Sequence, residues 1–109
     1  MKLLSRSEEL LLLAIWRLQD NAYGVTIRQQ IKEVTNKTWA FGALFVTLDR
    51  LVNKGLLESY LSEPTKERGG RSKRIYKLTP EGIKALTEIK KIEEAMWKDI
   101  SSLSLENTK

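Results

Sequence analysis

Residues 57–82 read LESYLSEPTKERGGRSKRIYKLTPEG and hold the most specific structural signals of the chain. Residues 57–62 and 74–78 are short segments typical of β-strands, and the second alternates between polar and apolar residues. The eleven residues between them are polar and include a Gly-Gly pair. This pattern predicts a β-hairpin with a long basic tip, followed at once by the start of a helix.

The hairpin carries the charge imbalance of the whole chain. Residues 66–77 hold six basic residues and one acidic residue, a net charge of +5, which equals the net charge of the protein. Concentrated positive charge attracts a phosphate backbone by Coulomb steering and counterion release. A basic run in isolation fits a solubilising loop equally well, so the surrounding elements must decide between the two interpretations.

The composition indicates one folded domain and excludes several kinds of site. The chain has 109 residues, 41% of them hydrophobic, which is enough for one core. It contains no cysteine and no histidine, so disulfides, Cys/His zinc sites and His-based catalysis are excluded. We find no paired carboxylates, phosphate-binding glycine loop or nucleophile motif, and we expect neither an enzyme, nor a cofactor, nor a metal site.

Two further observations indicate a cytoplasmic protein. The longest apolar run, residues 10–16, is far shorter than the ~20 residues of a membrane span. Glu8 and Glu9 stand between the basic start and this run, and no small-residue cleavage site follows, which is untypical of a secretory signal.

The first predicted helix begins at a capping box of Ser5 and Glu8. One face carries apolar residues at helical spacing: Leu11, Ala14, Ile15 and Leu18. The opposite side is apolar as well, through Leu10, Leu12, Leu13 and Trp16. A helix that is apolar on all sides is buried on all sides. We expect the second cover to come from another subunit.

Two more helices follow and complete a helix-turn-helix. The first of them is expected to begin at Thr26, capped together with Gln29, and to turn Ile27, Ile31 and Val34 inward. The next runs from Phe41 or Gly42 to Lys54, with Gly55 as its terminator. Three short helices with brief connections, followed by a basic hairpin, predict a winged helix-turn-helix.

The last helix is predicted from Pro80 to about Ser101, with Thr79 as N-cap and Pro80 at its first position. Its apolar residues recur every three or four positions: Ile83, Leu86, Ile89, Ile92, Met96, Ile100 and Leu103. An amphipathic helix of ~33 Å is longer than so small a domain can cover, so a second copy across a two-fold axis is the expected partner.

The expected fold is mainly α with a small β-hairpin: a winged helix-turn-helix plus a long C-terminal dimerisation helix. Residues 1–79 form the DNA-binding part and residues 80–109 the dimerisation helix and tail, within one compact structural unit.

Five short motifs carry a family resemblance. They are YG at 23–24, GALF at 42–45, KGL at 54–56, GGRSKRIY at 69–76 and LTPEG at 78–82. Through them, residues 5–100 resemble the PadR-like family of bacterial winged-helix transcriptional regulators, in particular its short members with one C-terminal helix. The resemblance implies a homodimer, with the first and last helices packed against the partner. It also implies binding to a pseudo-palindromic operator, usually with repression.

The recognition helix departs from the family pattern. The family often has a hydroxyl residue followed by Leu-Tyr-Pro, where this chain has Ala43-Leu44-Phe45-Val46. A tyrosine hydroxyl that could meet a phosphate is therefore missing.

A winged helix places its third helix in the major groove, with the N-terminal half at the base edges. The candidate contacts of that helix are Phe41, Gly42, Ala43, Phe45, Val46 and Thr47, with Arg50 and Lys54 as phosphate contacts. Phe45 and Val46 can offer apolar contact to thymine methyl groups, and Thr47 can hydrogen-bond to a base or a phosphate. From the second helix and the residue before it we add Tyr23, Thr26 and Arg28. From the hairpin we add Lys66, Arg68, Arg71, Lys73 and Arg74.

Four of these residues have a structural alternative. Gly42 fits a simple helix start as well as a close approach to DNA, and Phe45 fits a core position. Tyr23 fits either the core or a phosphate contact, and Thr26 is a cap under either interpretation.

The dimer interface is expected to contain Leu10, Leu12, Leu13, Trp16, Ile89, Ile92, Met96, Ile100 and Leu103. Related multidrug-sensing regulators carry a tryptophan on the last helix that stacks on planar drugs. The resemblance therefore implies an effector site formed by Trp97, Met96 and Trp16, for a small lipophilic or aromatic ligand. The alternative is that the tryptophans only fill the interface.

A second class of function also stays open: a winged-helix module whose hairpin binds an acidic protein instead of DNA.

Overall fold

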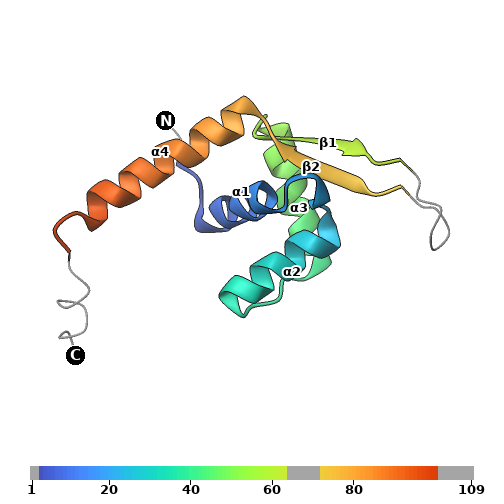
Figure 1. The fold of residues 1–109 in the computed structure, drawn as a ribbon, viewed down its shortest axis with the longest axis horizontal. Helices are drawn as coiled ribbons and strands as arrows, with labels where there is room; N and C mark the ends of the chain where they lie inside the picture. Colours follow the sequence, from blue (N-terminus) through green and yellow to red (C-terminus); the bar gives the residue numbers. More distant parts are fainter. Residues whose placement is uncertain (1–2, 64–71, 101–109) are drawn as a thin grey trace.

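The computed structural model describes residues 3–63 and 72–100. Figure 1 shows helices α1 (Arg6–Leu18), α2 (Gly24–Thr35), α3 (Phe41–Asn53) and α4 (Pro80–Trp97), together with an antiparallel hairpin of β1 (Leu57–Leu61) and β2 (Arg74–Leu78). A short 3₁₀ helix, Gln19–Asn21, follows α1. The described part of the chain is thus the winged helix-turn-helix that the sequence predicts.

Helix α1 lies at the centre of the fold and begins at the expected capping box. Ser5 Oγ accepts a hydrogen bond from the Glu8 N–H at 3.1 Å, and Glu8 Oε1 accepts one from the Ser5 N–H at 2.9 Å. One expectation for this helix is wrong. Leu12 is fully buried in the chain's own core, because α1 packs against α2, α3, α4 and β2. It is therefore not available to a partner subunit.

Helix α2 begins two residues earlier than expected, at Gly24. Thr26 is not its N-cap; it lies in the first turn, where its hydroxyl oxygen accepts a hydrogen bond from the Tyr23 N–H at 3.0 Å. Ile27 and Ile31 are buried as expected, but Val34 is 68% exposed. The last turn of α2 extends past the core, and Val34 forms part of an open groove between α1 and α2.

The hairpin is fastened to the helical part by its second strand. Leu57 pairs with Leu78 at its base and Leu61 with Arg74 toward its tip. On the other edge of β2, the Tyr76 N–H donates to the Ala22 carbonyl oxygen at 2.9 Å. This bond ties the residues just before α2 to the hairpin.

The turn into α4 is closely packed. Thr79 caps α4 by accepting a hydrogen bond from the Gly82 N–H at 3.0 Å, and its hydroxyl donates to the Gly55 carbonyl oxygen at 2.6 Å. A Cβ atom at Gly82 would overlap the carbonyl oxygen of Leu56. Gly55 itself has φ +79° and ends α3 as predicted. The glycine at the end of the LTPEG motif is therefore required because the backbone of Leu56 passes directly over the first turn of α4.

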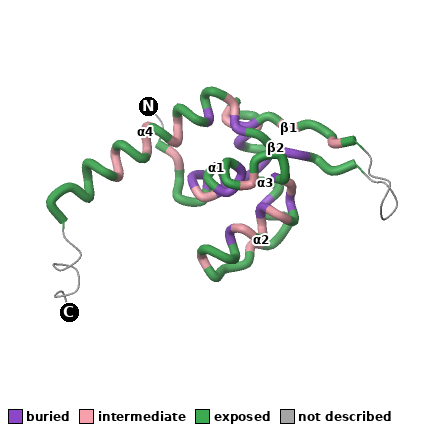
Figure 2. Tube along the Cα trace, in the orientation of Figure 1, coloured by how far each residue is buried: buried purple, intermediate pink, exposed green. Residues whose placement is uncertain are grey.

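Helix α4 leaves the body of the protein, and Figure 2 shows that its buried part is the turn beside the hairpin. The Cα radius of gyration is 16.6 Å, against about 13 Å for a compact domain of 100 residues.

Helix α4 ends at Trp97 instead of Ser101, since Lys98 has ψ 135° and Asp99 has φ +65°. Its 18 residues span about 27 Å. In the described ranges, no helix combines the length and apolar character needed to cross a membrane.

Candidate nucleic-acid interface

The N-terminal half of α3 has one buried and one exposed side. Leu44 and Leu48 anchor it in the core. On the other side, Phe41 is 40%, Phe45 41% and Val46 63% exposed. Gly42 and Ala43 are exposed as well, and a Cβ at Gly42 would meet nothing within 4 Å. The side expected to face DNA is open, and it is apolar.

Thr47 does not belong to this side. Its side chain is buried, with 8% of the residue exposed, and its hydroxyl donates to the Ala43 carbonyl oxygen at 3.0 Å. The expectation that Thr47 bonds to a base or a phosphate is therefore wrong. The apolar sequence around it gave no sign that this one hydroxyl turns toward the core.

Phe45 is partly packed and partly exposed, so its contact with DNA stays a prediction. Its ring lies against Gly24 of α2, where a Cβ atom would stand 2.8 Å from Phe45 Cζ. The same ring stacks on Phe41, with centroids 6.1 Å apart and an interplanar angle of 19°. Arg28 lies 4.3 Å above the Phe41 ring and donates from Nε to the Trp39 carbonyl oxygen. Arg28 thereby joins α2 to the start of α3.

The half of the hairpin toward its tip adds two cations to this end of the molecule. Lys73 Nζ lies 4.3 Å from the centre of the Tyr23 ring, and Arg74 Nη1 donates to Ser59 Oγ at 3.0 Å. Tyr23 is half-buried and both cations are exposed. Three other expected contacts, Lys66, Arg68 and Arg71, lie outside the described residues.

Arg50 and Lys54 have a partner that the sequence did not predict. Lys54 Nζ lies 2.6 Å and Arg50 Nε 3.7 Å from Oε2 of the buried Glu8. Burial alone raises the pKa of Glu8, but hydrogen bonds from Lys54 and Ser5 and attraction to Lys54 lower its pKa below the ordinary value. The two cations tie the C-terminal end of α3 to the start of α1. Their side chains are still 50% and 40% exposed, so a phosphate contact by Arg50 or Lys54 stays a prediction.

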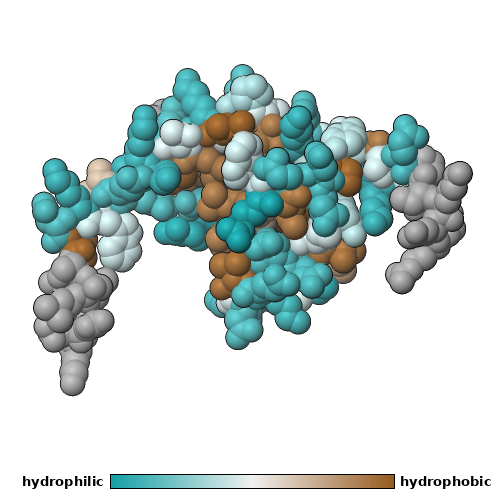
Figure 3. Space-filling model, viewed as in Figure 1, coloured by the Kyte–Doolittle hydropathy of each residue, from teal (hydrophilic) through white to brown (hydrophobic). Residues whose placement is uncertain are grey.

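Apart from the buried Leu12, the expected interface residues are found in three states, and one of them, Leu10, lines the groove between α1 and α2 instead of the α1–α4 face. Leu13, Trp16, Met96 and Ile100 are exposed, Leu10, Ile89 and Ile92 are half-buried, and Leu103 lies outside the described residues. A groove of about 480 Å³ runs between α1 and α4, lined by Trp16 and Ile83 among others. Met96 and Trp97 lie one turn further along α4, outside this groove. Figure 3 shows apolar side chains gathered over the centre of the molecule.

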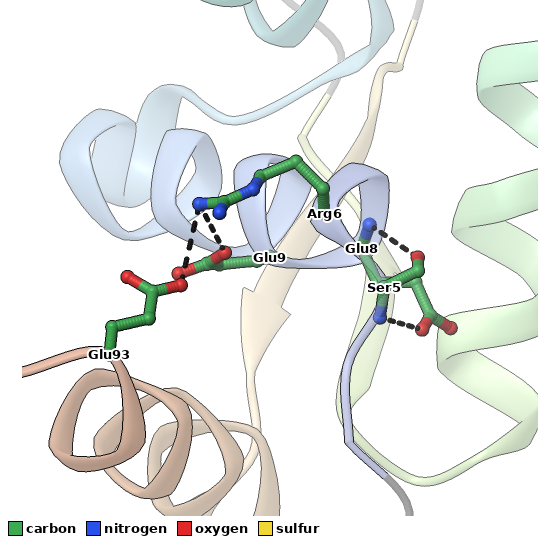
Figure 4. Close-up of polar contacts among 5 residues, drawn as sticks. All are labelled: Ser5, Arg6, Glu8, Glu9 and Glu93. Carbon is green, nitrogen blue, oxygen red and sulfur yellow. Dashed lines mark hydrogen bonds and ion pairs between the residues drawn. The ribbon is translucent and has the colours of Figure 1, made fainter. Parts of the chain in front are cut away.

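A polar cluster closes one end of the groove. Figure 4 shows the Arg6 guanidinium between two carboxylates, with Nη1 at 3.2 Å from Glu9 Oε1 and 3.3 Å from Glu93 Oε1. Glu9 is buried. Burial, a hydrogen bond with Glu93 and repulsion by Glu93 raise the pKa of Glu9, and Arg6 only partly offsets them. The sequence indicated Glu8 as a cap but gave no signal for this second carboxylate.

The comparisons with known proteins agree with this geometry. The family model described as "Transcriptional regulator PadR-like family" matches residues 12–88. A PadR family transcription regulator from Clostridium difficile is 31% identical, with a TM-score of 0.66 over 90% of this chain and 97% of that one. RosR from H. salinarum is 26% identical, with a TM-score of 0.70 over 91% and 82% of the two chains.

A PadR-like regulator from Bacillus cereus is 22% identical, with a TM-score of 0.69 over 93% of this chain and 88% of the other, and it shows the fold alone. No curated protein sequence matches.

Proposed function

The chain belongs to the PadR-like family of transcriptional regulators, and from this premise we propose that it acts in the cytoplasm as a homodimeric repressor that binds a pseudo-palindromic operator. It is a regulator and not an enzyme. The observation that carries the proposal is the position of three features at one end of the molecule. These are the open side of α3, the start of α2 and the basic hairpin.

Each feature has a part in binding duplex DNA. Helix α3 enters the major groove with its first two turns at the base edges. The first N–H groups of α2 and the Arg28 side chain face a phosphate. Lys73 and Arg74 follow the backbone on the hairpin side, where each neutralised phosphate releases counterions.

The α1–α4 face supplies the dimer. Leu13, Trp16, Ile83 and Met96 expose apolar surface there, and α4 extends beyond the body of its own chain. Apposition of two such faces across a two-fold axis would bury them, and binding to a pseudo-palindromic operator requires the two α3 helices to lie on successive major grooves, about 34 Å apart.

The proposal is tested by fluorescence anisotropy with a labelled duplex from the DNA upstream of the gene and a scrambled duplex of equal length. The native duplex should bind more tightly, and the logarithm of its affinity should fall linearly with the logarithm of salt concentration. Lys73→Ala should reduce the salt slope by about one unit and weaken binding to both duplexes. Lys91→Ala, an exposed cation on α4, is the control and should change neither. Equal, salt-independent binding of both duplexes contradicts operator binding and favours a protein-binding module.

We also propose that the regulator responds to a flat lipophilic ligand at the dimer interface. The support is the exposure of Trp16, Met96 and Trp97, whose aromatic and thioether groups favour planar molecules. Because the groove within one chain lacks Met96 and Trp97, the site requires residues of two subunits. Titration with planar cationic dyes should quench tryptophan emission and release the operator, and unchanged emission in the dimer contradicts the proposal.

A further inference from the structure

The surface that α3 presents for base readout contains no free hydrogen-bonding side chain in its first two turns. Residues 41–47 read FGALFVT. Leu44 is buried, and the one hydroxyl of the segment, on Thr47, is buried and bonded to the Ala43 carbonyl oxygen. What remains exposed is aromatic, aliphatic or without a side chain.

The polar side chains that surround this surface contact their own chain, are assigned above to phosphates, or lie elsewhere. Arg28 donates from Nε to the Trp39 carbonyl oxygen and lies over the Phe41 ring. Arg50 Nε is 3.7 Å from Glu8, toward the other end of α3. Asp49 is negatively charged, as the phosphates are, and lies beyond the second turn of α3. The cations Lys73 and Arg74 belong to the hairpin, not to the helix.

Major-groove edges offer hydrogen-bonding groups and one apolar group, the 5-methyl of thymine. A surface without side-chain donors or acceptors has the thymine methyl group as its main means of distinguishing base pairs. Val46 is the most exposed of the apolar residues, and Phe45 lies beside it. Phe45 is held between Gly24 and Phe41. Its side chain is therefore ordered before DNA binds, and little of its contact energy is lost to the entropy of ordering it.

We infer that this regulator reads its operator by apolar contact of Phe45 and Val46 with thymine 5-methyl groups, without base-edge hydrogen bonds from the first two turns of α3. The inference rests on the proposed DNA-binding function and names the feature of DNA that this surface recognises. The surrounding cations favour a polyanionic partner for the apolar surface over a second protein.

The test begins with selection of binding sites from a random duplex library by the full-length chain. The selected duplex is then made in a second form, in which uracil replaces thymine and only the methyl groups are lost. Each lost methyl contact should reduce the affinity about fourfold, so two or more should reduce it at least ~10-fold. At the most sensitive position, a 5-methylcytosine·guanine pair should bind more tightly than cytosine·guanine.

A pair of valine variants connects the methyl effect to the protein. Val46→Ala should weaken binding to the thymine duplex and remove the difference between thymine and uracil at one position of each half-site. Val34→Ala removes the same atoms from a valine of similar exposure, 68% against 63%, at the far end of α2. Val34→Ala should leave both affinities unchanged, which separates a direct contact from a general effect of uracil on DNA shape.

The outcomes separate this inference from the function on which it rests. Failure of the selection to enrich any sequence overturns operator binding, and the inference with it. Enrichment of a site whose thymine and uracil forms bind within twofold of each other leaves the regulator function intact and overturns the methyl readout. A uracil effect that is unchanged in Val46→Ala also overturns it, because the methyl groups then act without this side chain.

Discussion

Two regions of the molecule expose apolar side chains, and they differ in the charges beside them. At the end formed by α3 and the hairpin, aromatic rings lie under cations: Arg28 over Phe41 and Lys73 over Tyr23. On the α1–α4 face, the groove lined by Leu13 and Trp16 is bordered by charges of both signs: Glu9 and Glu93, with Lys90 in the groove and Arg6 between the two carboxylates. Exposed apolar surface indicates an interface in both cases. The neighbouring charge distinguishes the partners: an excess of cations favours DNA, whereas a balanced set of charges suits a protein surface.

The two regions are connected through two places in the fold. Glu8 links α1 to the end of α3 through Lys54. Gly82 links α4 to the chain just before β1, because it lies directly against Leu56. Substitutions at these places should affect both regions, and substitutions within either region should affect only that one.

The largest effect is expected for Gly82→Ala. The added Cβ overlaps the Leu56 carbonyl oxygen, so backbone must move, and overpacking of this kind costs about 3 kcal/mol. Thermal or urea unfolding at fixed protein concentration measures the loss. Because the contact between Gly82 and Leu56 connects both regions, dimer formation and DNA binding should weaken together in this variant. Unchanged stability contradicts the close packing of this turn.

Next in size is Leu13→Glu, which places a charge on the α1–α4 face. Removal of a central apolar interface contact costs about 2 kcal/mol, or a ~30-fold weaker dimer. Sedimentation equilibrium measures the dimer, and circular dichroism at high protein concentration checks that each chain stays folded. Leu61→Glu changes an exposed leucine of the hairpin and should leave the dimer intact. Equal dimer constants for the two variants exclude this face as the interface.

A smaller effect, confined to the DNA-binding end, is expected for Gly42→Ala. No atom lies within 4 Å of the added Cβ, and alanine favours the helix, so stability should be equal or higher by up to ~1 kcal/mol. If the backbone of α3 approaches DNA closely at this position, the methyl group should reduce operator affinity about 10-fold. Unchanged affinity identifies Gly42 as a simple helix start. Together with Gly82→Ala, this variant compares the same substitution with and without a neighbouring backbone.

The sequence predicted most of the fold because its signals are local. The capping box at Ser5, the terminator Gly55 and the Thr79-Pro80 helix start each depend on neighbours within four residues, and all three were confirmed. Hydrophobic periodicity located the helices for the same reason.

The errors arose where distant segments meet. Leu12 is buried because three helices and a strand surround α1, and Thr47 because its rotamer turns back to Ala43. Lys54 is paired with a residue 46 positions away. Neither spacing nor composition shows which cation has an internal partner, so the sequence alone did not show that Arg50 and Lys54 both lie beside Glu8.

The smallest expected effect distinguishes two adjacent residues, Glu8 and Glu9. The pKa of Glu8 is lowered in the folded state, so its carboxylate stabilises the protein at neutral pH, and this contribution is lost as the pH falls through its folded pKa, below 4.5. The pKa of Glu9 is raised, so its contribution is largest at low pH and is lost as the pH rises through its folded pKa, above 4.5.

Glutamine substitutions should therefore have opposite effects at pH 7. Glu8→Gln should lower the free energy of unfolding by about 1 kcal/mol, because a charged hydrogen bond to Lys54 is lost. Glu9→Gln should raise it by less than ~1 kcal/mol, because repulsion with Glu93 is removed while the exposed Arg6 loses only a weak pair. Urea unfolding between pH 3.5 and 7 measures both curves, which should approach wild type on acidification, Glu9→Gln first. If both substitutions change the free energy of unfolding in the same direction at pH 7, the predicted difference between Glu8 and Glu9 is wrong. The two carboxylates would then experience the same environment although one faces α3 and the other α4.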